Sequence, residues 1–247
     1  MNSIRLAKND RHAFTLIELL VIIAVIGVLA ALLLTAVSRT KGSSRQTHCA
    51  NNVRQLGIAL QGYLTANHAY PLAGKVHWEY TLHESELGPT TNSYFDLMQQ
   101  GVWKCPNANK PANYWEDLYN SYGYNFYGMQ SPGGITNLQG LGVHSWSFSE
   151  SPVKESEVVS PSEMIAIGDG FMGGKDMIRD GVGNLMRTYG IPFGGTARAY
   201  ARHQGKANVV FCDGHVESPT LKFLFEDTSD AALVRWNRDH LPHRDRL

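Results

Sequence analysis

The 247-residue sequence has no excess of charge of either sign, because 22 Lys and Arg residues balance 22 Asp and Glu residues. Nucleic-acid-binding domains usually carry a basic surplus that contacts phosphates, so no nucleic-acid partner is expected. The chain also lacks the GxSxG, P-loop and HExxH motifs of several large enzyme classes. We therefore predict a non-enzymatic protein with no catalytic residue, no bound metal and no cofactor.

Cysteine is scarce, with only Cys49, Cys105 and Cys212. No CxxC pair occurs, so the spacing matches no zinc motif. Three cysteines allow at most one disulfide within the chain and leave at least one thiol.

Charge and proline are absent from residues 19–37, which form the longest apolar run. About 20 apolar residues in a helix cross a hydrocarbon core of roughly 30 Å, so a membrane-spanning helix is predicted. Arg5, Lys8 and Arg11 outnumber Asp10 before the run, which favours a cytoplasmic N-terminus. A cleaved secretory signal peptide is the alternative, but its apolar region is shorter, at about 7–15 residues.

One carboxylate, Glu18, stands at the start of this run. Insertion scales give a cost of roughly 2.5 kcal/mol or more for an ionised carboxylate in lipid, so such residues usually have a positive partner. Cleavage after Ala13 would create an α-amine on Phe14, four residues before Glu18. The alternative is a hydrated interfacial residue.

The residues "AFTLIE" resemble the processing site of type IV prepilins and type II secretion pseudopilins. The resemblance implies that a prepilin peptidase removes a leader of residues 1–13, that Phe14 is N-methylated, and that Glu18 guides assembly. Two positions depart from the family pattern: Ala13 replaces the usual glycine, and Thr35 stands where many members have proline.

Beyond the apolar run, the helix is predicted to continue to about Asn67, ahead of Pro71. Gly42-Ser43-Ser44 is expected to loosen it. Apolar residues recur on one helical face that we expect to pack on a sheet: Ala50, Val53, Leu56, Leu60, Tyr63 and Leu64.

From Ala69 onward, glycine, proline, asparagine and tyrosine replace the helical pattern. A strand or short helix is predicted within 77–87 and a short helix within 93–101. Strands are predicted within 102–111, 121–130 and 163–170, and two strands within 206–218 meet at Asp213-Gly214, a strong hairpin signal.

The segments "CANNVRQLGIALQGY", "SPSEMIAIGDG" and "RHQGKANVVFCDGHVE" resemble landmarks of a large bacterial pilin-like group, whose members end in a His, nine residues and Asp-Gly. Here these are His203, Asp213 and Gly214. The resemblance implies an α+β pilin-like fold with a long N-terminal transmembrane helix packed on an antiparallel sheet. Its parts are a leader (1–13), a transmembrane half-helix (14–37), an outer amphipathic half-helix (38–68) and a globular head (69–247).

The same resemblance implies a structural subunit of a type IV pilus or a type II secretion pseudopilus. Its partners would be other pilin or pseudopilin subunits, the prepilin peptidase, the inner-membrane assembly platform and membrane lipid. The protein would cross the bacterial inner membrane once, with a periplasmic head, before joining the filament. Disulfides persist in that compartment. Cys49 lies on the predicted helix and Cys105 on a predicted head strand, so they are the expected pair; three buried free thiols are the alternative.

Two further readings of the head stay open: a minor pilin that binds a ligand, and a membrane-anchored metalloenzyme. The metalloenzyme reading depends on two histidines and two aspartates, because two histidines and a carboxylate can hold zinc or iron. These residues are His203, His215, Asp169 and Asp213. The structural interpretation is that Asp213-Gly214 makes a turn and that His203 bonds a backbone group or Asp213.

Two other sets of residues suggest ligands. Asp176 and Asp180 lie in a glycine-rich stretch and are candidates for calcium, although the spacing is not that of an EF-hand. An aromatic group is a candidate stacking surface for glycan or nucleic acid, or else part of the core: Tyr122, Tyr124, Phe126 and Tyr127.

Overall fold

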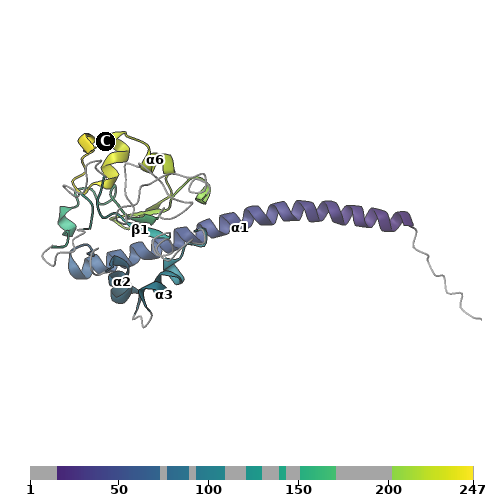
Figure 1. The fold of residues 1–247 in the computed structure, drawn as a ribbon, viewed down its shortest axis with the longest axis horizontal. Coiled ribbons are helices and arrows are strands. Elements are labelled where there is room, and N and C mark those ends of the chain that lie inside the picture. The colour runs from purple at the N-terminus through teal and green to yellow at the C-terminus, as the bar shows by residue number, and fades with distance from the viewer. Residues whose placement is uncertain are drawn as a thin grey trace, which may run out of the picture. The chain divides into compact units, whose positions relative to one another are not determined.

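The computed structural model describes residues 16–72, 77–88, 93–108, 121–129, 139–142, 151–170 and 202–246. The chain divides into two compact units, Met1–Ser44 and Arg45–Leu247. Helix α1 (Leu16–Asn67) belongs to both (Figure 1). It ends at the predicted residue and continues through Gly42-Ser43-Ser44, where loosening was expected.

In the first unit, the segment Leu16–Leu34 of α1 is long and apolar enough to cross a membrane. Its leucine, isoleucine and valine side chains are 43–81% exposed. A continuous exposed apolar surface of this length suits a segment that lipid covers. The predicted membrane-capable helix is therefore present.

The second unit contains a four-stranded antiparallel sheet in the order β1-β2-β3-β4. The strands are β1 (Tyr122–Tyr124), β2 (Ile165–Asp169), β3 (Val209–Phe211) and β4 (Val216–Glu217). Gly123 pairs with Gly168, and Ile167 pairs with Val210. The predicted strands within 121–130, 163–170 and 206–218 are confirmed. The last range contains both β3 and β4, which pair with each other and are joined through Asp213-Gly214.

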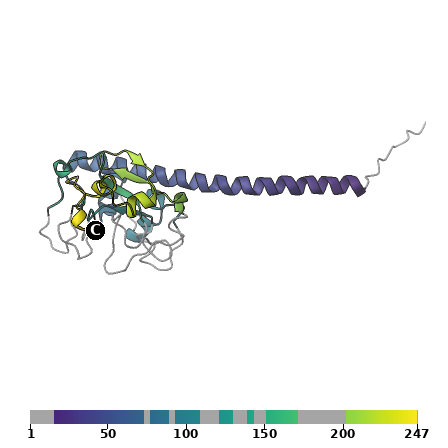
Figure 2. The ribbon, with the colours of Figure 1, turned by 90° about the horizontal axis from the view of Figure 1, so that it is seen from above.

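The two faces of the sheet contact different helices. On one face, Ile167 and Val210 pack in a core with Val53, Leu56 and Leu60 of α1. On the other face, a second core joins strand residues to α6 (Leu221–Phe225) and α7 (Asp230–Leu233), and its strand members are Ile165, Val209 and Phe211. Figure 1 shows α1 and α6 on opposite sides of β1, and Figure 2 gives the view from above.

Short helices complete the second unit. They are α2 (Trp78–Leu82), η1 (His83–Leu87), α3 (Tyr94–Met98), η2 (Gly101–Trp103), η3 (Glu155–Glu157), η4 (Arg202–Gln204), η5 (Val234–Trp236) and η6 (Arg244–Arg246). Residues 78–87 are thus helical, and the helix predicted within 93–101 is confirmed. The α+β arrangement is the one that the family resemblance implies.

The strand predicted within 102–111 is wrong for the residues described there. Trp103 ends the 3₁₀ helix η2, and residues 104–108 form no strand. The N–H of Cys105 donates to the Ser121 hydroxyl at 3.2 Å instead of to a neighbouring strand. A side-chain acceptor therefore replaces the ladder that a strand would need.

Gly57 lets α1 approach β3 closely. A Cβ atom at this position would lie 2.5 Å from Cγ2 of Val210. Val210 is buried and β-branched, so its side chain has little freedom to move aside. Helix and sheet can pack at this distance because residue 57 has no side chain.

We expect Gly57→Ala to destabilise the head by about 1–3 kcal/mol, the usual cost of overpacking. The gain in helix propensity, about 1 kcal/mol, offsets part of the clash. The measurement is denaturant unfolding of the full chain in detergent, followed by tryptophan fluorescence. Gly42→Ala is the matched control on the same helix, because no atom of the described residues lies within 4 Å of the Cβ that it would add. Equal effects of the two changes would contradict the account.

Candidate functional site: the start of α1 and a buried aspartate cluster

The predicted processing residues, Ala13 and Phe14, lie outside the described residues. Glu18 lies in the first turn of α1. Together with Ile17, Val21 and Ile22 it lines a shallow, open depression on the helix surface. The carboxylate therefore stands on an otherwise apolar face, at the N-terminal end of the segment that is able to span a membrane.

The predicted motif of His203, Asp213 and Gly214 separates into two groups of residues in the structure. The first group is the turn at Asp213 and Gly214. The Oδ1 atom of Asp213 accepts a hydrogen bond from the N–H of His215 at 3.1 Å and lies 2.6 Å from Nδ1 of the same histidine. Gly214 has a φ of +91°, a conformation that side chains disfavour. Asp213 and Gly214 therefore shape the connection between β3 and β4, and this group is partly exposed.

The second group surrounds His203, whose side chain is fully buried. Its Nε2 atom lies 3.3 Å from Oδ2 of Asp169. The acidic partner is thus the aspartate at the end of β2 and not Asp213, which was one of the two expected partners of His203 beside a backbone group. The reason is that the segment before β3 passes the end of β2, where Asp169 N–H donates to the carbonyl of Asn208 at 2.9 Å.

Asp169 is the centre of this buried group. Its Oδ2 accepts from the backbone N–H of Asn208 at 2.7 Å and from the amide of that side chain at 2.9 Å. Its Oδ1 lies 3.3 Å from Nη2 of Arg202. The same Nη2 donates to the carbonyl of Ser121, and Nη1 donates to that of Gly170. Burial alone would raise the pKa of Asp169, but the bond from His203 and the charge of Arg202 outweigh burial and lower it.

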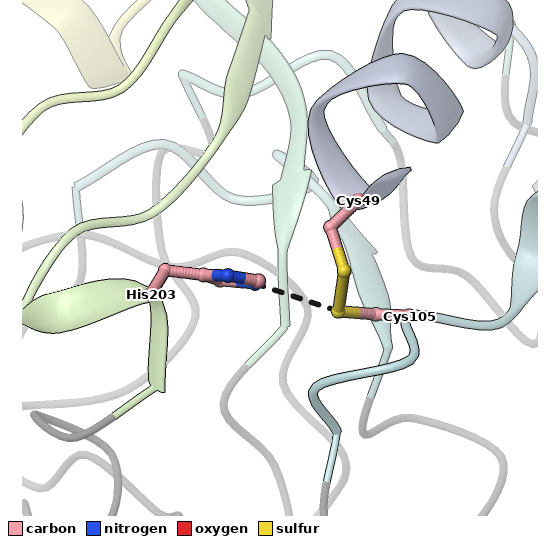
Figure 3. A group of neighbouring side chains, drawn as sticks. All are labelled: Cys49, Cys105 and His203. Carbon is pink, nitrogen blue, oxygen red and sulfur yellow. Dashed lines mark hydrogen bonds between the residues drawn. A yellow bond between two sulfur atoms is a disulfide. The ribbon is translucent and has the colours of Figure 1, made fainter. Parts of the chain in front are cut away.

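A disulfide between Cys49 and Cys105 borders the group, as Figure 3 shows. The predicted pairing is confirmed, and Cys212 is a buried free thiol. Nε2 of His203 lies 3.4 Å from Sγ of Cys105, and Nδ1 lies 3.2 Å from the side-chain amide of Asn107. The disulfide links α1 to the loop after η2.

The geometry does not match that of a nucleophilic triad. In a triad the base uses one ring nitrogen for the carboxylate and the other for the nucleophile. Here Nε2 faces both Asp169 and Cys105, and Nδ1 faces an amide. Cys105 is also held in the disulfide, so the described group has no free nucleophile.

The other sequence candidates fall elsewhere. His203 and His215 belong to separate groups, so the structure does not assemble the predicted two-histidine metal site among the residues it describes. Asp176 and Asp180 lie outside the described residues. The aromatic residues belong to the core, with exposures of 7% or less, and present no stacking surface: Tyr122, Tyr124, Phe126 and Tyr127.

Sequence reasoning missed two buried charged residues. Arg202 adjoins the motif histidine, but nothing in its sequence context marks it as buried. Glu79 on α2 is fully buried; Oε1 accepts from the Tyr94 hydroxyl at 3.2 Å, and Oε2 has no hydrogen-bond partner among the described residues. Burial raises the pKa of Glu79 to about 7, against smaller lowering effects of its hydrogen bonds.

Because the folded-state pKa of Glu79 is raised, the contribution of this group to stability is most favourable below its unfolded pKa of about 4.3 and declines as the pH rises to about 7. Glu79→Gln should remove this loss and be more stable than wild type at pH 8, by on the order of 2 kcal/mol. Denaturant unfolding at pH 4.5 and pH 8 measures this. Glu86→Gln, on the exposed η1, is the control; the same pH profile in wild type and Glu79→Gln would refute the prediction.

Comparison with known proteins finds a family match in the N-terminal region and one relative that is similar over part of the chain. Residues 8–34 match the family described as the prokaryotic N-terminal methylation motif. Type II secretion system core protein G of Pseudomonas aeruginosa is 31% identical over 64 residues. That alignment covers 26% of this chain and 45% of the relative, so the chain spans just under half of that protein. No solved structure matches the chain significantly.

Proposed function

We propose that this chain, which is prepilin-like by its N-terminal motif and its α+β fold, is a structural subunit of a type IV pilus or a type II secretion pseudopilus. One observation carries the proposal. The methylation motif at residues 8–34 covers the same stretch as the membrane-capable helix Leu16–Leu34, with Glu18 at the start of that helix.

In this proposal a prepilin peptidase cuts between Ala13 and Phe14, and the new N-terminus is methylated. The subunit then spans the inner membrane once through α1, and its head lies in the periplasm. The Cys49–Cys105 disulfide supports that location, because disulfides persist in oxidising compartments. The assembly platform extracts the subunit from lipid into a filament of like subunits.

The chemistry of the head supports a structural role. The described cluster around Asp169 is closed, with the side chains of Asp169, Arg202 and His203 at most 1% exposed. A substrate would have no access to it. The cluster instead ties β2 to the segment before β3 and to the disulfide loop.

The experiment is localisation of a C-terminally tagged chain in its native cells. Filaments are sheared from the surface, labelled with antibody to the tag and viewed by electron microscopy. We expect labelling along the length of fibres and co-purification of assembly-platform proteins. Labelling confined to fibre tips would indicate a minor, ligand-binding pilin. A chain found only in the membrane fraction, without fibres and without assembly-platform proteins, would refute the subunit role.

A further inference from the structure

Three buried donor atoms converge beside the sheet. Sγ of Cys49, Sγ of Cys105 and Nε2 of His203 all lie within 4.8 Å of one another. They come from α1, from the loop after η2 and from η4, as Figure 3 shows. A fourth donor, Oδ2 of Asp169, lies 3.3 Å from the same Nε2 atom.

The backbone at His203 is held in a disfavoured conformation. His203 has φ 50° and ψ 29°, and Gln204 follows with φ 59°. Left-handed conformations are unfavourable for non-glycine residues, and they persist where the surroundings impose them, often at functional sites. Here the conformation directs the imidazole toward the sulfur atoms and Asp169.

Two separations in this group match the edges of a zinc tetrahedron. Zinc binds sulfur at about 2.3 Å and nitrogen or oxygen at about 2.0–2.1 Å, so tetrahedral sulfur–nitrogen and nitrogen–oxygen edges are about 3.6 and 3.4 Å. The distance from Nε2 of His203 to Sγ of Cys105 is 3.4 Å, and to Oδ2 of Asp169 it is 3.3 Å. The two sulfur atoms need to separate to about 3.8 Å, and the carboxylate of Asp169, which lies outside the group of donors within 4.8 Å of one another, needs to move closer to the sulfur atoms.

The charges of the group would also balance. Two thiolates and one carboxylate carry three negative charges, which Zn²⁺ and the buried guanidinium of Arg202 would neutralise. A buried set of ions is tolerated only when its charges are compensated, and this one would be neutral. Thiolate, imidazole and carboxylate ligands together are also a donor set that zinc accepts.

We propose that the reduced head binds one zinc ion through Cys49, Cys105, His203 and Asp169, so that the disulfide and the metal are alternative occupants of one site. Reduction by a phosphine consumes one water: the S–S bond breaks, two S–H bonds form, and the phosphine becomes its oxide. Zinc then displaces both thiol protons, and the neutral imidazole offers the lone pair of Nε2 to the ion.

The test uses the full chain in detergent with a water-soluble phosphine. Reduction is complete when titration finds three thiols instead of one. If the count stays at one, urea is added to expose the buried disulfide to the phosphine and is then dialysed away. We expect about one zinc per reduced chain by elemental analysis and none in the oxidised chain. Cobalt(II) should give sulfur-to-metal charge-transfer bands, and zinc-edge X-ray absorption should give two sulfur and two nitrogen or oxygen neighbours.

Variants separate this site from other thiol chemistry. His203→Ala should weaken zinc binding by more than the roughly 10–100-fold that loss of an outer-shell partner costs. Cys212→Ser should leave binding unchanged. Absence of stoichiometric zinc in the reduced wild type, a shell with three sulfur atoms, or an unchanged affinity in His203→Ala would overturn the proposal; the absorption measurement on wild type decides even if the variant fails to fold.

Discussion

Replacing Asp169 with alanine is expected to cost the head about 3–5 kcal/mol of stability, the usual effect of breaking a buried ion pair. The change leaves the guanidinium of Arg202 buried without its carboxylate and removes the acceptor for two donors of Asn208. Asp169→Asn keeps the shape and should cost less. Denaturant unfolding of the full chain in detergent, followed by tryptophan fluorescence, measures both.

Asp213 provides the matched control, because the chain has a second Asp-Gly step in the β3–β4 turn. Its side chain is 37% exposed, and its pairing with His215 is open to solvent. Surface pairs of this kind contribute about 0–1 kcal/mol, so Asp213→Ala should have a small effect. Equal losses at the two aspartates would contradict the view that Asp169 alone organises a buried cluster.

Acid should act on the same residue. The pKa of Asp169 is lowered in the folded state, so its contribution to stability is present above its unfolded pKa of about 3.9. That contribution is lost as the pH falls through the folded-state pKa. Asp169→Asn should therefore lose less stability than wild type when the pH is lowered below about 4.

The largest functional effect is expected at Glu18. Glu18→Ala should abolish filaments or make them irregular, while membrane insertion and head folding stay intact. In lipid, apolar helix faces give little preference for one register over another. Pairing with the charged N-terminal amine of a neighbouring subunit lowers the free-energy cost of the carboxylate in the membrane. The same pairing sets the axial offset between the two subunits.

Filament yield after shearing, measured by electron microscopy, tests this effect, with the amount of chain in the membrane fraction as the control. Glu18→Asp keeps the charge and should retain part of the yield. Glu18→Gln should fail if charge is required and survive if a hydrogen bond suffices. Normal filaments from Glu18→Ala would show that the carboxylate is only hydrated at the interface.

The helical half of the fold was predictable from spacing alone. Apolar positions such as Val53, Leu56 and Leu60 repeat with the helical period, and each is fully buried. Local turn chemistry likewise located the hairpin, because Asp213-Gly214 carries its own signal. The Cys49–Cys105 bond was predicted from the expected compartment and from the places of Cys49 on the helix and Cys105 in the head.

The buried cluster was not predictable, because its contacts join residues far apart in the sequence. The sequence has three Asp-Gly steps with the same local signal. Of the two that the structure describes, Asp169 rather than Asp213 meets His203, 34 positions after it. Arg202 and Glu79 resemble surface residues in sequence, since burial of a charge depends on partners that three-dimensional packing supplies. The strand predicted around Cys105 was wrong because the backbone N–H of Cys105 donates to the hydroxyl of Ser121, a contact that the local sequence does not reveal.

The central claim is that this chain is matured as a prepilin, and the mass of its N-terminal peptide in native cells tests that claim most directly. The account predicts a mature chain that begins at Phe14, with the added mass of one methyl group on its α-amine. A chain that keeps residues 1–13 in cells with an active prepilin peptidase would contradict it. So would a mature chain that begins after Ser38, because a secretory signal peptidase would then have removed Glu18 and the whole membrane-capable segment.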